Sequence, residues 1–289
     1  MDRLTTWVDS ETAKLTHVVI GLPDTFHQSD PEIINETQQR YYFTEDHPDP
    51  EKLIGEFAEF RKLLEKCGVT VYQPSAVEGV PDQLTPRDIG FVIGDTLVLS
   101  NMAKRSRKTE WRGMERILRQ LDSPVTHVPE RVIIEGGDVV IHNGVIYVGI
   151  SERTSYEAID FLVKKFPQYE VITMPLRPPQ SGQEILHLDC TFLPAGNRQA
   201  LFYPGGIVEI PRSITDQFEL IEITSEEQKE LAVNVLSLSP RAIISRSRTA
   251  RVNTLLRETG LEVFELDFDQ APKTGGSFRC CTLPLRRGG

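Results

Sequence analysis

Two adjacent cysteines, Cys280 and Cys281 in the segment TGGSFRCCTLPL, are the residues of this 289-residue chain best suited to nucleophilic chemistry. A cysteine attacks as the thiolate, so it needs a lowered pKa or a neighbouring base. The glycines just before the pair allow the backbone to approach a ligand closely. If the segment is a strand, alternation directs only one of the two thiols into a pocket. The alternative is that both cysteines are small buried residues of a core.

His187 in the segment ILHLDCTFLP is the candidate for moving protons, because an imidazole titrates near neutral pH. Asp189 follows two residues later and would share a face with it if the segment is a strand. Glu135 in IIEGGDVV precedes two glycines and Asp138, and a carboxylate there could orient an imidazole and stabilise its charged form. A structural histidine and a glycine-rich hairpin with solvated acids are the alternatives.

Asp88 and two arginines are candidates for binding. Asp88 follows a proline-fixed turn in TPRDIGF, where an ordinary loop acid is the alternative. Arg107 in KRSRKTEW and Arg153 in ISERTS are candidate clamps for an anion, since a guanidinium matches carboxylate geometry with two parallel hydrogen bonds. Surface arginines at helix starts are the more common case. Taken one at a time, these residues do not identify a function.

A recurring order of helix, short strand and polar loop would position these side chains. The clearest helix is predicted over Pro50–Cys67, where apolar residues recur at helical spacing and Gly68 follows as a stop. The same order recurs in TEWRGMERILRQL before PVTHVP, SYEAIDFLVKKF before YEVITMPL, EEQKELAVNVLSL before RAIIS and ARVNTLLRETG before LEVFELD. Asn143–Gly144 predicts a hairpin turn. Five such units fit either a circular array or an irregular α+β domain.

Three candidates lie at the same distance from the helix-strand units that precede them. Asp88 lies twenty residues after Gly68, His187 twenty after Pro167, and Cys280 twenty after Gly260. In a closed ring of similar units, equivalent loops converge on the central axis. An acid, a histidine and a cysteine would then meet in one pocket.

Composition limits the classes of partner and compartment. The formal net charge of −10 disfavours nucleic acid and anionic membrane surfaces as partners. Neither a signal peptide nor an apolar run of membrane-spanning length is present. The chain has four cysteines and no CxxC pair, which disfavours a zinc ribbon and predicts a reducing, cytoplasmic location.

Together, six segments resemble the guanidino-group-modifying enzyme superfamily, which comprises arginine deiminases, dimethylarginine dimethylaminohydrolases and glycine amidinotransferases. The resemblance runs from about Gly21 to the C-terminus, and the segments stand in family order: TPRDIGFVIGD, NMAKRSRKTEW, EGGDVV, GISERTS, HLDCTF and GGSFRCCTLPL. It implies a five-fold pseudosymmetric α/β propeller of ββαβ-type units around a central polar site. One catalytic domain over residues 1–289 is then expected.

The resemblance also implies roles for single residues. Cys280 matches the nucleophile and His187 the general acid and base. Glu135 matches the carboxylate that orients the histidine, and Asp138 a supporting acid near it. The implied chemistry is attack of the thiolate on a guanidinium carbon to give an amidino-cysteine, with no metal or organic cofactor.

Four further residues match the substrate-binding positions of the family. Asp88 and Asp189 match acids that grip the guanidinium nitrogens by charge-assisted hydrogen bonds. Arg107 and Arg153 match the clamp on the α-carboxylate, so the expected ligand is a small guanidino amino acid. A homodimer is possible, and the long polar stretch from Leu22 to Pro50 is predicted to be a lid.

The sequence favours a hydrolase that gives citrulline, with arginine ahead of methylarginines. The acid at Asp189 differs from better-known dimethylarginine hydrolases and is similar to deiminases and amidinotransferases. Amidino transfer and a double hydrolysis to ornithine therefore remain open. A non-catalytic arginine-binding protein is the alternative from another class, and an unrelated cysteine protease has little support.

Overall fold

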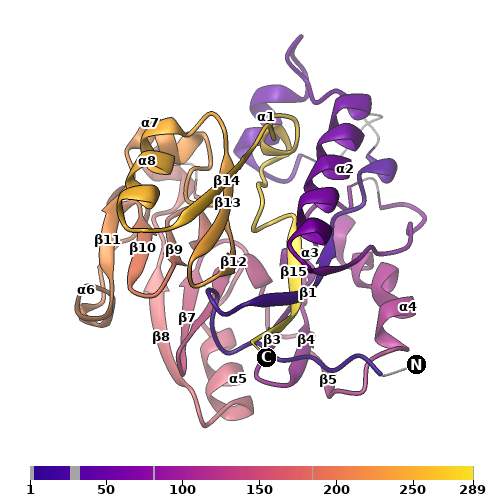
Figure 1. Ribbon diagram of the computed structural model, residues 1–289. Helices are drawn as coiled ribbons and strands as arrows, with labels where there is room; N and C mark the ends of the chain where they lie inside the picture. Colours follow the sequence, from indigo (N-terminus) through magenta and orange to yellow (C-terminus); the bar gives the residue numbers. More distant parts are fainter. Residues whose placement is uncertain (1–2, 27–32, 81, 184, 289) are drawn as a thin grey trace.

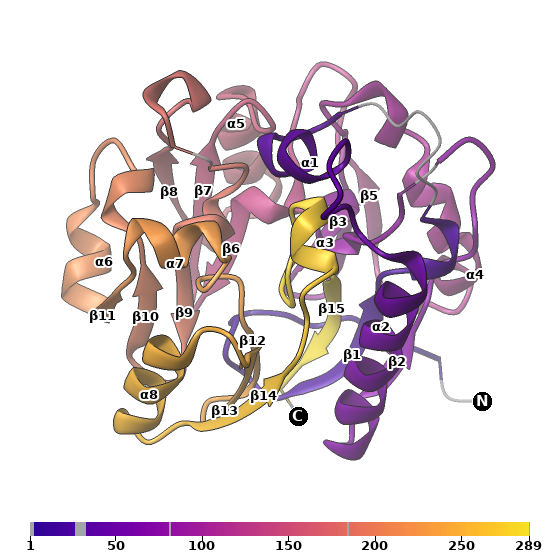
Figure 2. The same cartoon turned by 90° about the horizontal axis from the view of Figure 1, so that it is seen from above.

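Five three-stranded sheets, called blades below, form a ring in the computed structural model, which describes residues 3–26, 33–80, 82–183 and 185–288 (Figures 1 and 2). The strands of the first three blades are β15 (Thr282–Arg287), β1 (Leu15–Ile20) and β2 (Thr70–Tyr72); β3 (Gly90–Ile93), β4 (Thr96–Leu99) and β5 (Val125–His127); and β6 (Val139–His142), β7 (Val145–Ile150) and β8 (Glu170–Pro175). Those of the last two are β9 (Phe192–Ala195), β10 (Gln199–Phe202) and β11 (Glu219–Glu222); and β12 (Leu236–Ser239), β13 (Ala242–Arg246) and β14 (Glu262–Leu266). The α/β propeller implied by the resemblance is confirmed.

Every blade has the same internal pairing. The central strand pairs antiparallel with one neighbour and parallel with the other. A parallel pair needs a crossover connection, and each blade places a helix there. These helices are α2 (Pro50–Lys66), α4 (Glu115–Leu118), α5 (Glu157–Lys165), α6 (Arg212–Gln217) and α8 (Ala250–Glu258).

Helix α2 shows why the predicted helices form where they do. Asp49 caps it by accepting from the N–H groups of Glu51 and Lys52, and Pro50 occupies the first turn. Its apolar stripe buries Phe57 and Phe60 against aromatic rings from the C-terminal part of the chain. The helix predicted over Pro50–Cys67 is therefore confirmed to within one residue.

The prediction for the fourth helix–strand unit is wrong. The segment EEQKELAVNVLSL contains only the short helix α7 (Ser225–Lys229), because Leu231 adopts a left-handed backbone with φ of 56°. The chain then enters β12 and the hairpin to β13 of the last blade. Helix α6 with β11 is the true fourth unit.

The hairpin predicted at Asn143–Gly144 is confirmed. Both residues have positive φ, 49° and 84°, as a tight turn between the paired strands β6 and β7 requires. No helix in the described part of the chain is long and apolar enough to cross a membrane.

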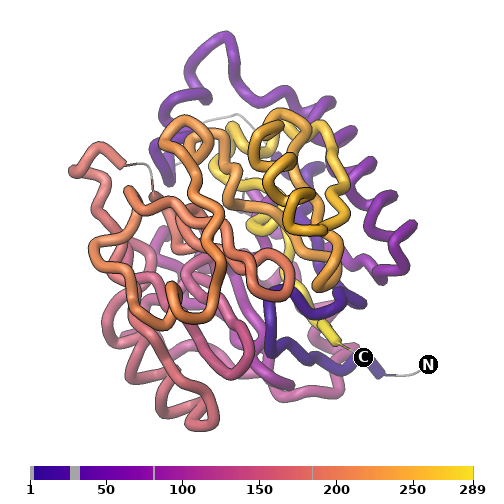
Figure 3. The backbone as a smooth tube through the Cα atoms, turned by 60° about the vertical axis from the view of Figure 1, so that its left-hand side comes forward, coloured from indigo at the N-terminus to yellow at the C-terminus, as the bar shows by residue number. Residues whose placement is uncertain are grey.

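The ring is closed by the two ends of the chain. Strand β15 pairs antiparallel with β1, so the C-terminal strand completes the first blade (Figure 3). This pairing fixes the segment just before β15, which contains both adjacent cysteines.

Candidate active site

Polar side chains lie one to three residues before the first strand of each blade, where the chain enters the centre of the ring. They are Asp88 before β3, Asp138 before β6, Asp189 before β9, Asn234 before β12 and Cys280 before β15. The predicted convergence of the loops is thus explained by equivalent positions in successive blades. Asp88 lies in the short helix α3 (Pro86–Ile89), Asp138, Asp189 and Cys280 lie in turns, and Asn234 lies in the irregular segment before β12.

Cys280 is buried among polar groups. Its Sγ accepts a hydrogen bond from Nδ2 of Asn234 at 3.1 Å and donates to Oδ2 of Asp189 at 3.4 Å. Burial, followed by the charges of Asp189 and Asp88, raises the pKa of the Cys280 thiol well above its usual value. The group is therefore a neutral thiol until a cation approaches it.

Cys281 has a different environment. It is fully buried in the apolar cluster that contains Phe60 and Phe278. Only one thiol of the pair faces the polar centre, as alternation predicted. The two cysteines belong to a turn, however, and not to the strand that follows it.

His187 lies between two carboxylates. Its Nε2 is 2.9 Å from Oε2 of Glu135, and its Nδ1 is 3.6 Å from Oδ1 of Asp88. Burial lowers the pKa of His187, but the charges of Asp88, Asp138 and Glu135 outweigh burial and raise that pKa to about 9. Burial opposes ionisation of Glu135 too, yet the hydrogen bond and charge of His187 lower the Glu135 pKa to about 2. At neutral pH the pair is an imidazolium held by a carboxylate.

The glycines after Glu135 have a steric role. A Cβ at Gly137 would lie 2.6 Å from the ring of His187 and 3.0 Å from Oδ1 of Asp88. Only glycine lets this loop pass so close to the imidazole. The predicted hairpin alternative for this segment is wrong, because Gly136–Asp138 form a 3-10 turn that leads into β6.

Asp138 supports the loop that carries His187. Its Oδ1 accepts from the N–H of Leu188 at 2.9 Å, and its Oδ2 accepts from Oγ of Ser151 at 2.7 Å. Residues Leu188–Cys190 form a 3-10 turn and not the predicted strand. His187 therefore precedes this turn, and Asp189 lies at its middle position.

Asp189 has a partner that the sequence did not reveal. Nη1 of Arg279 donates to its Oδ2 at 2.8 Å, and Nη2 of Arg279 donates to Glu11 at 2.7 Å. These three side chains are at most 5% exposed. Asp189 is thus tied to an arginine of its own chain as well as to the thiol of Cys280.

Arg107 is also engaged inside the protein. Its Nε donates to Glu110 and its Nη1 to Asp88, both at 2.7 Å, and its Nη2 donates to Thr85. Burial outweighs the charge of Arg107 and raises the pKa of Glu110 to about 7. The structure places this arginine on the substrate acid predicted at Asp88 and not at the pocket described below.

Arg153 is placed between the site and the predicted lid. Its Nη1 lies 3.4 Å from Oε2 of Glu135, and its Nη2 donates to the backbone oxygen of Ile34. The described part of that stretch contains η1 (Pro23–Thr25) and α1 (Glu36–Tyr41). Residues 27–32 of the predicted lid lie outside the described residues.

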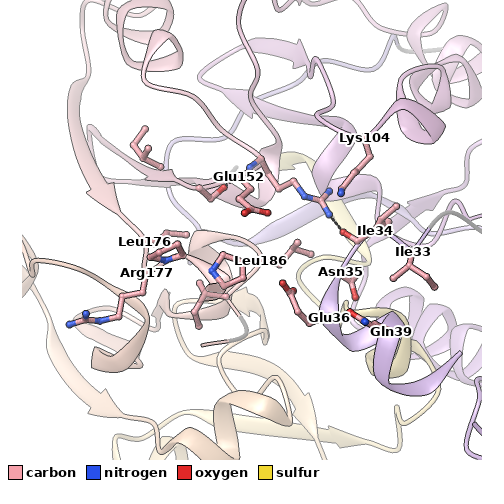
Figure 4. A pocket seen from close by; sticks show the side chains of 16 residues that line it. Ile33, Ile34, Asn35, Glu36, Gln39, Lys104, Glu152, Leu176, Arg177 and Leu186 are labelled. Atoms are coloured by element: carbon pink, nitrogen blue, oxygen red, sulfur yellow. Dashed lines mark hydrogen bonds between the residues drawn. The ribbon is translucent and has the colours of Figure 1, made fainter. Parts of the chain in front are cut away.

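The segment around α1 covers the catalytic candidates. Nδ2 of Asn35 and Nε2 of Gln38 both donate to the backbone oxygen of Thr274 at 3.1 Å, six residues before Cys280. Outside the buried residues lies a cavity of about 460 Å³, lined by Ile34 and Asn35 and by Arg153 (Figure 4). Arg153 is the predicted site residue that this cavity shares with the buried centre, where it contacts Glu135.

Three of these residues could also hold a metal ion. Ligand atoms of Asp88, Glu135 and His187 lie within 4.8 Å of one another. However, Nε2 of His187 already bonds to Glu135, and Asp88 already accepts from Arg107. In this structure the three side chains are arranged as a protonated imidazole between two carboxylates.

Comparisons with known proteins identify the family of this chain. The family model described as N,N dimethylarginine dimethylhydrolase, eukaryotic, matches residues 23–287. The chain belongs to the guanidino-group-modifying enzymes. The uncharacterized protein YkgA of Bacillus subtilis (strain 168) is 34% identical to it over 96% of this chain and 94% of its own length.

One further protein of this superfamily is similar to the chain in sequence, and another is similar in fold. An arginine deiminase of Bacillus thuringiensis subsp. konkukian is 26% identical over 75% of this chain and 64% of its own length. The structure of inosamine-phosphate amidinotransferase StrB1 from Streptomyces griseus has a TM-score of 0.82 and 18% identity, covering 100% of this chain and 98% of its own. At that identity the likeness concerns the fold.

Asn234 is a residue of this candidate site that the sequence did not single out. Its side chain contacts Sγ of Cys280 and accepts from the N–H groups of Ser277 and Cys280. Its position two residues before the strand LSLS, equivalent to that of Asp88 before β3, is the signal that could have revealed it.

Replacing Asn234 by alanine should lower both stability and kcat. The change leaves two buried N–H groups unpaired and frees the sulfur, at a cost of roughly 1–3 kcal/mol for each unpaired group. Asn253→Ala is the matched control, since Asn253 is equally buried but bonds to Arg246 and Thr249. Denaturant unfolding and steady-state kinetics on both variants test this. Equal loss of kcat in the two would contradict a local role for Asn234.

The charge of His187 should make stability depend on pH. Its pKa of about 9 in the folded protein exceeds the usual 6.5, so its contribution is fully present below pH 6.5 and is lost as pH rises through 9. We expect the free energy of unfolding to fall over that interval by on the order of 3 kcal/mol. Denaturant titrations of the wild type and His187→Gln at several pH values measure this. Parallel curves for the two proteins would contradict it.

Proposed function

We propose that this chain is a cysteine-dependent hydrolase of the guanidino group of arginine or an N-methylated arginine, giving citrulline and ammonia or a methylamine. The observation that carries the proposal is the pairing of two buried groups with opposite tendencies. Cys280 is held as a neutral thiol, and His187 is held as a cation beside Glu135. A guanidinium substrate suits both groups. Its positive charge favours ionisation of the nucleophile, and its leaving nitrogen needs the proton that the acid carries.

Asp88 would bind the substrate cation. Its Oδ1 and the Nδ1 of His187 are buried and have no hydrogen-bond partner among the described residues. A planar guanidinium carries the N–H donors that Asp88 Oδ1 lacks, and Asp189, which accepts from the thiol at 3.4 Å, supplies a second carboxylate next to Sγ. Binding would therefore place the cation beside Sγ of Cys280.

The first half of the reaction forms the covalent intermediate. The substrate cation favours ionisation of the Cys280 thiol, whose proton can move to Asp189, its hydrogen-bond acceptor. The sulfur then bonds to the guanidinium carbon, and the tetrahedral adduct loses one nitrogen as the amine. His187 gives its proton to that nitrogen as the C–N bond breaks.

The second half returns the enzyme to its starting state. The now neutral His187 takes a proton from water, and the hydroxide attacks the carbon of the amidino-cysteine. The C–S bond breaks, and the sulfur takes back its proton from Asp189. The hydroxyl proton of the adduct passes to the released amine, which leaves as an ammonium ion, so that a ureido group remains on the product and the thiol on Cys280. Glu135 keeps the imidazole oriented throughout, through its 2.9 Å contact with Nε2.

Product analysis by mass spectrometry tests the proposal. The purified protein is incubated with arginine, with dimethylarginine, and with arginine plus glycine. Citrulline from either of the first two supports hydrolysis and assigns the leaving amine. Guanidinoacetate would instead indicate amidino transfer, and ornithine with two equivalents of ammonia would indicate a double hydrolysis. Binding of arginine by calorimetry without any product would replace the proposal with a binding protein.

A further inference from the structure

Three arginines and one glutamate form a buried cluster that the proposed reaction does not use. Nη2 of Arg279 donates to Oε1 of Glu11 at 2.7 Å, and Nη1 of Arg87 lies 3.8 Å from the same oxygen. Arg287 is the third arginine, and each of the four side chains belongs to a residue at most 5% exposed. Burial raises the pKa of Glu11, but the charges of all three arginines lower it to about 2. These four residues are called the arginine cluster below.

The arginine cluster lies inside the ring, between the catalytic candidates and the N-terminal segment. Val8 and Ser10, which precede Glu11, pair with residues at the ends of β3 and β6, whose starts lie at the polar centre. The segment therefore crosses the opposite end of these strands. Arg279 connects the two regions, because it donates to Asp189 as well as to Glu11.

The arginine cluster carries more positive than negative charge. Its three guanidinium groups share two carboxylates, Glu11 and Asp189, and no other carboxylate forms an ion pair with them among the described residues. Burial and the charge of Arg279 lower the pKa of Arg87 to about 9 and that of Arg287 to about 10. Both arginines therefore stay charged at neutral pH. One buried positive charge remains without a counterion, which is costly for a folded protein.

The same arginines have N–H groups without an acceptor. Nε and Nη2 of Arg287 and Nη2 of Arg87 are buried and have no hydrogen-bond partner in the described part of the chain. Nη1 of Arg287 donates to the backbone oxygens of Ala13 and Ser237, both at 2.8 Å, so the side chain is held in place. Nε and Nη2 form one edge of a guanidinium, and such an edge presents two N–H groups to an anion.

A buried water could accept hydrogen bonds from these groups, but it would leave the charge uncompensated. A small anion does both. We propose that the arginine cluster binds a monovalent anion of the size of chloride or formate, held by the Nε–Nη2 edge of Arg287 with Nη2 of Arg87 as a further donor. The anion joins β15, which contains Arg287, to α3, which contains Arg87 and the substrate acid Asp88. The site does not depend on the proposed hydrolase activity, and its test needs no turnover.

Thermal unfolding at constant ionic strength tests the proposal, with sodium chloride or sodium formate replacing sodium gluconate, whose anion is bulky. Each small anion should raise the melting temperature of the wild type along a saturable curve, by roughly 2–4 °C at ten times its dissociation constant. Arg287→Lys should lose most of this rise, because an ammonium keeps the charge but lacks the two-donor edge. Arg286→Met is the matched control, since this neighbouring arginine bonds to Thr5 at an exposed position, and it should keep the rise. An equal rise in the wild type and Arg287→Lys would overturn the site.

Crystals grown in sodium bromide give an independent readout, which stands even if Arg287→Lys does not fold. The anomalous signal of bromide should locate the ion within hydrogen-bonding distance of Nε and Nη2 of Arg287. Ordered water at that edge without an anomalous peak would overturn the proposal. A bromide peak in a protein whose melting temperature does not respond to chloride or formate would mark an adventitious ion only, and would also overturn it.

Discussion

Replacing Cys280 by alanine is expected to abolish turnover, whereas Cys281→Ala should keep most of the wild-type kcat. Sγ of Cys280 is the group that contacts Asn234 and Asp189, and no other atom there can form a bond to the guanidinium carbon. Cys281 packs in the apolar cluster around Phe278, so its loss acts on stability. Product formation by mass spectrometry, at matched protein concentrations, gives the two rates.

Two controls make the cysteine result decisive. Thermal unfolding of Cys280→Ala should stay close to that of the wild type, which shows that lost activity is chemical. Rapid acid quenching of the wild type during turnover should reveal an amidino adduct on the peptide that contains Cys280. Turnover by a verified Cys280→Ala preparation would rule out this nucleophile, and an adduct on Cys281 would reassign it.

Replacing His187 by glutamine should lower kcat by about 10²–10⁴, the usual contribution of general acid–base catalysis. Glutamine can keep a hydrogen bond to Glu135 but cannot carry a proton to the leaving nitrogen. The wild-type rate should also decline as pH rises through 9, because the raised pKa of His187 marks where the acid is lost. The residual rate of the variant should lack this decline.

The matched control for this experiment is His127→Gln, at an exposed position in β5. It should leave both kcat and the pH profile unchanged. A variant at His187 that keeps the alkaline decline would show that another group donates the proton. Full activity in His187→Gln would contradict the mechanism.

Local features of the sequence predicted much of the fold. The helix over Pro50–Cys67 and the turn at Asn143–Gly144 depend on caps, stops and positive φ values that neighbouring residues supply. The misassigned fourth unit shows the limit of such patterns. Its apolar spacing is helical, yet the left-handed backbone at Leu231 ends the helix and the next residues join a sheet. Pairing between distant strands decided that segment.

The buried ion pairs could not be predicted from the sequence. Arg279 and Glu11 are 268 residues apart, and only closure of the ring brings them together. Without that pair, Asp189 looks like a free acid of the motif HLD. Arg107 presents the same difficulty at shorter range, because Glu110 lies only three residues away and accepts hydrogen bonds from two of the nitrogens of the arginine, while Asp88 accepts from the third. Spacing predicted which residues lie at the centre of the ring. It did not predict which of their charges are already balanced by an ion pair within the protein.

Because β15 closes the ring against β1, Cys280 reaches its neighbours only after the strand that follows it has been synthesised. During translation the strand Leu15–Ile20 emerges early, and its hydrogen-bonding edge stays open until residues 282–287 have left the ribosome. The sulfur two residues before that last strand meets its amide and carboxylate neighbours only at the same moment. An unfinished chain therefore exposes an unpaired strand edge, and its Cys280 thiol lacks the contacts with Asn234 and Asp189 that position it in the folded protein.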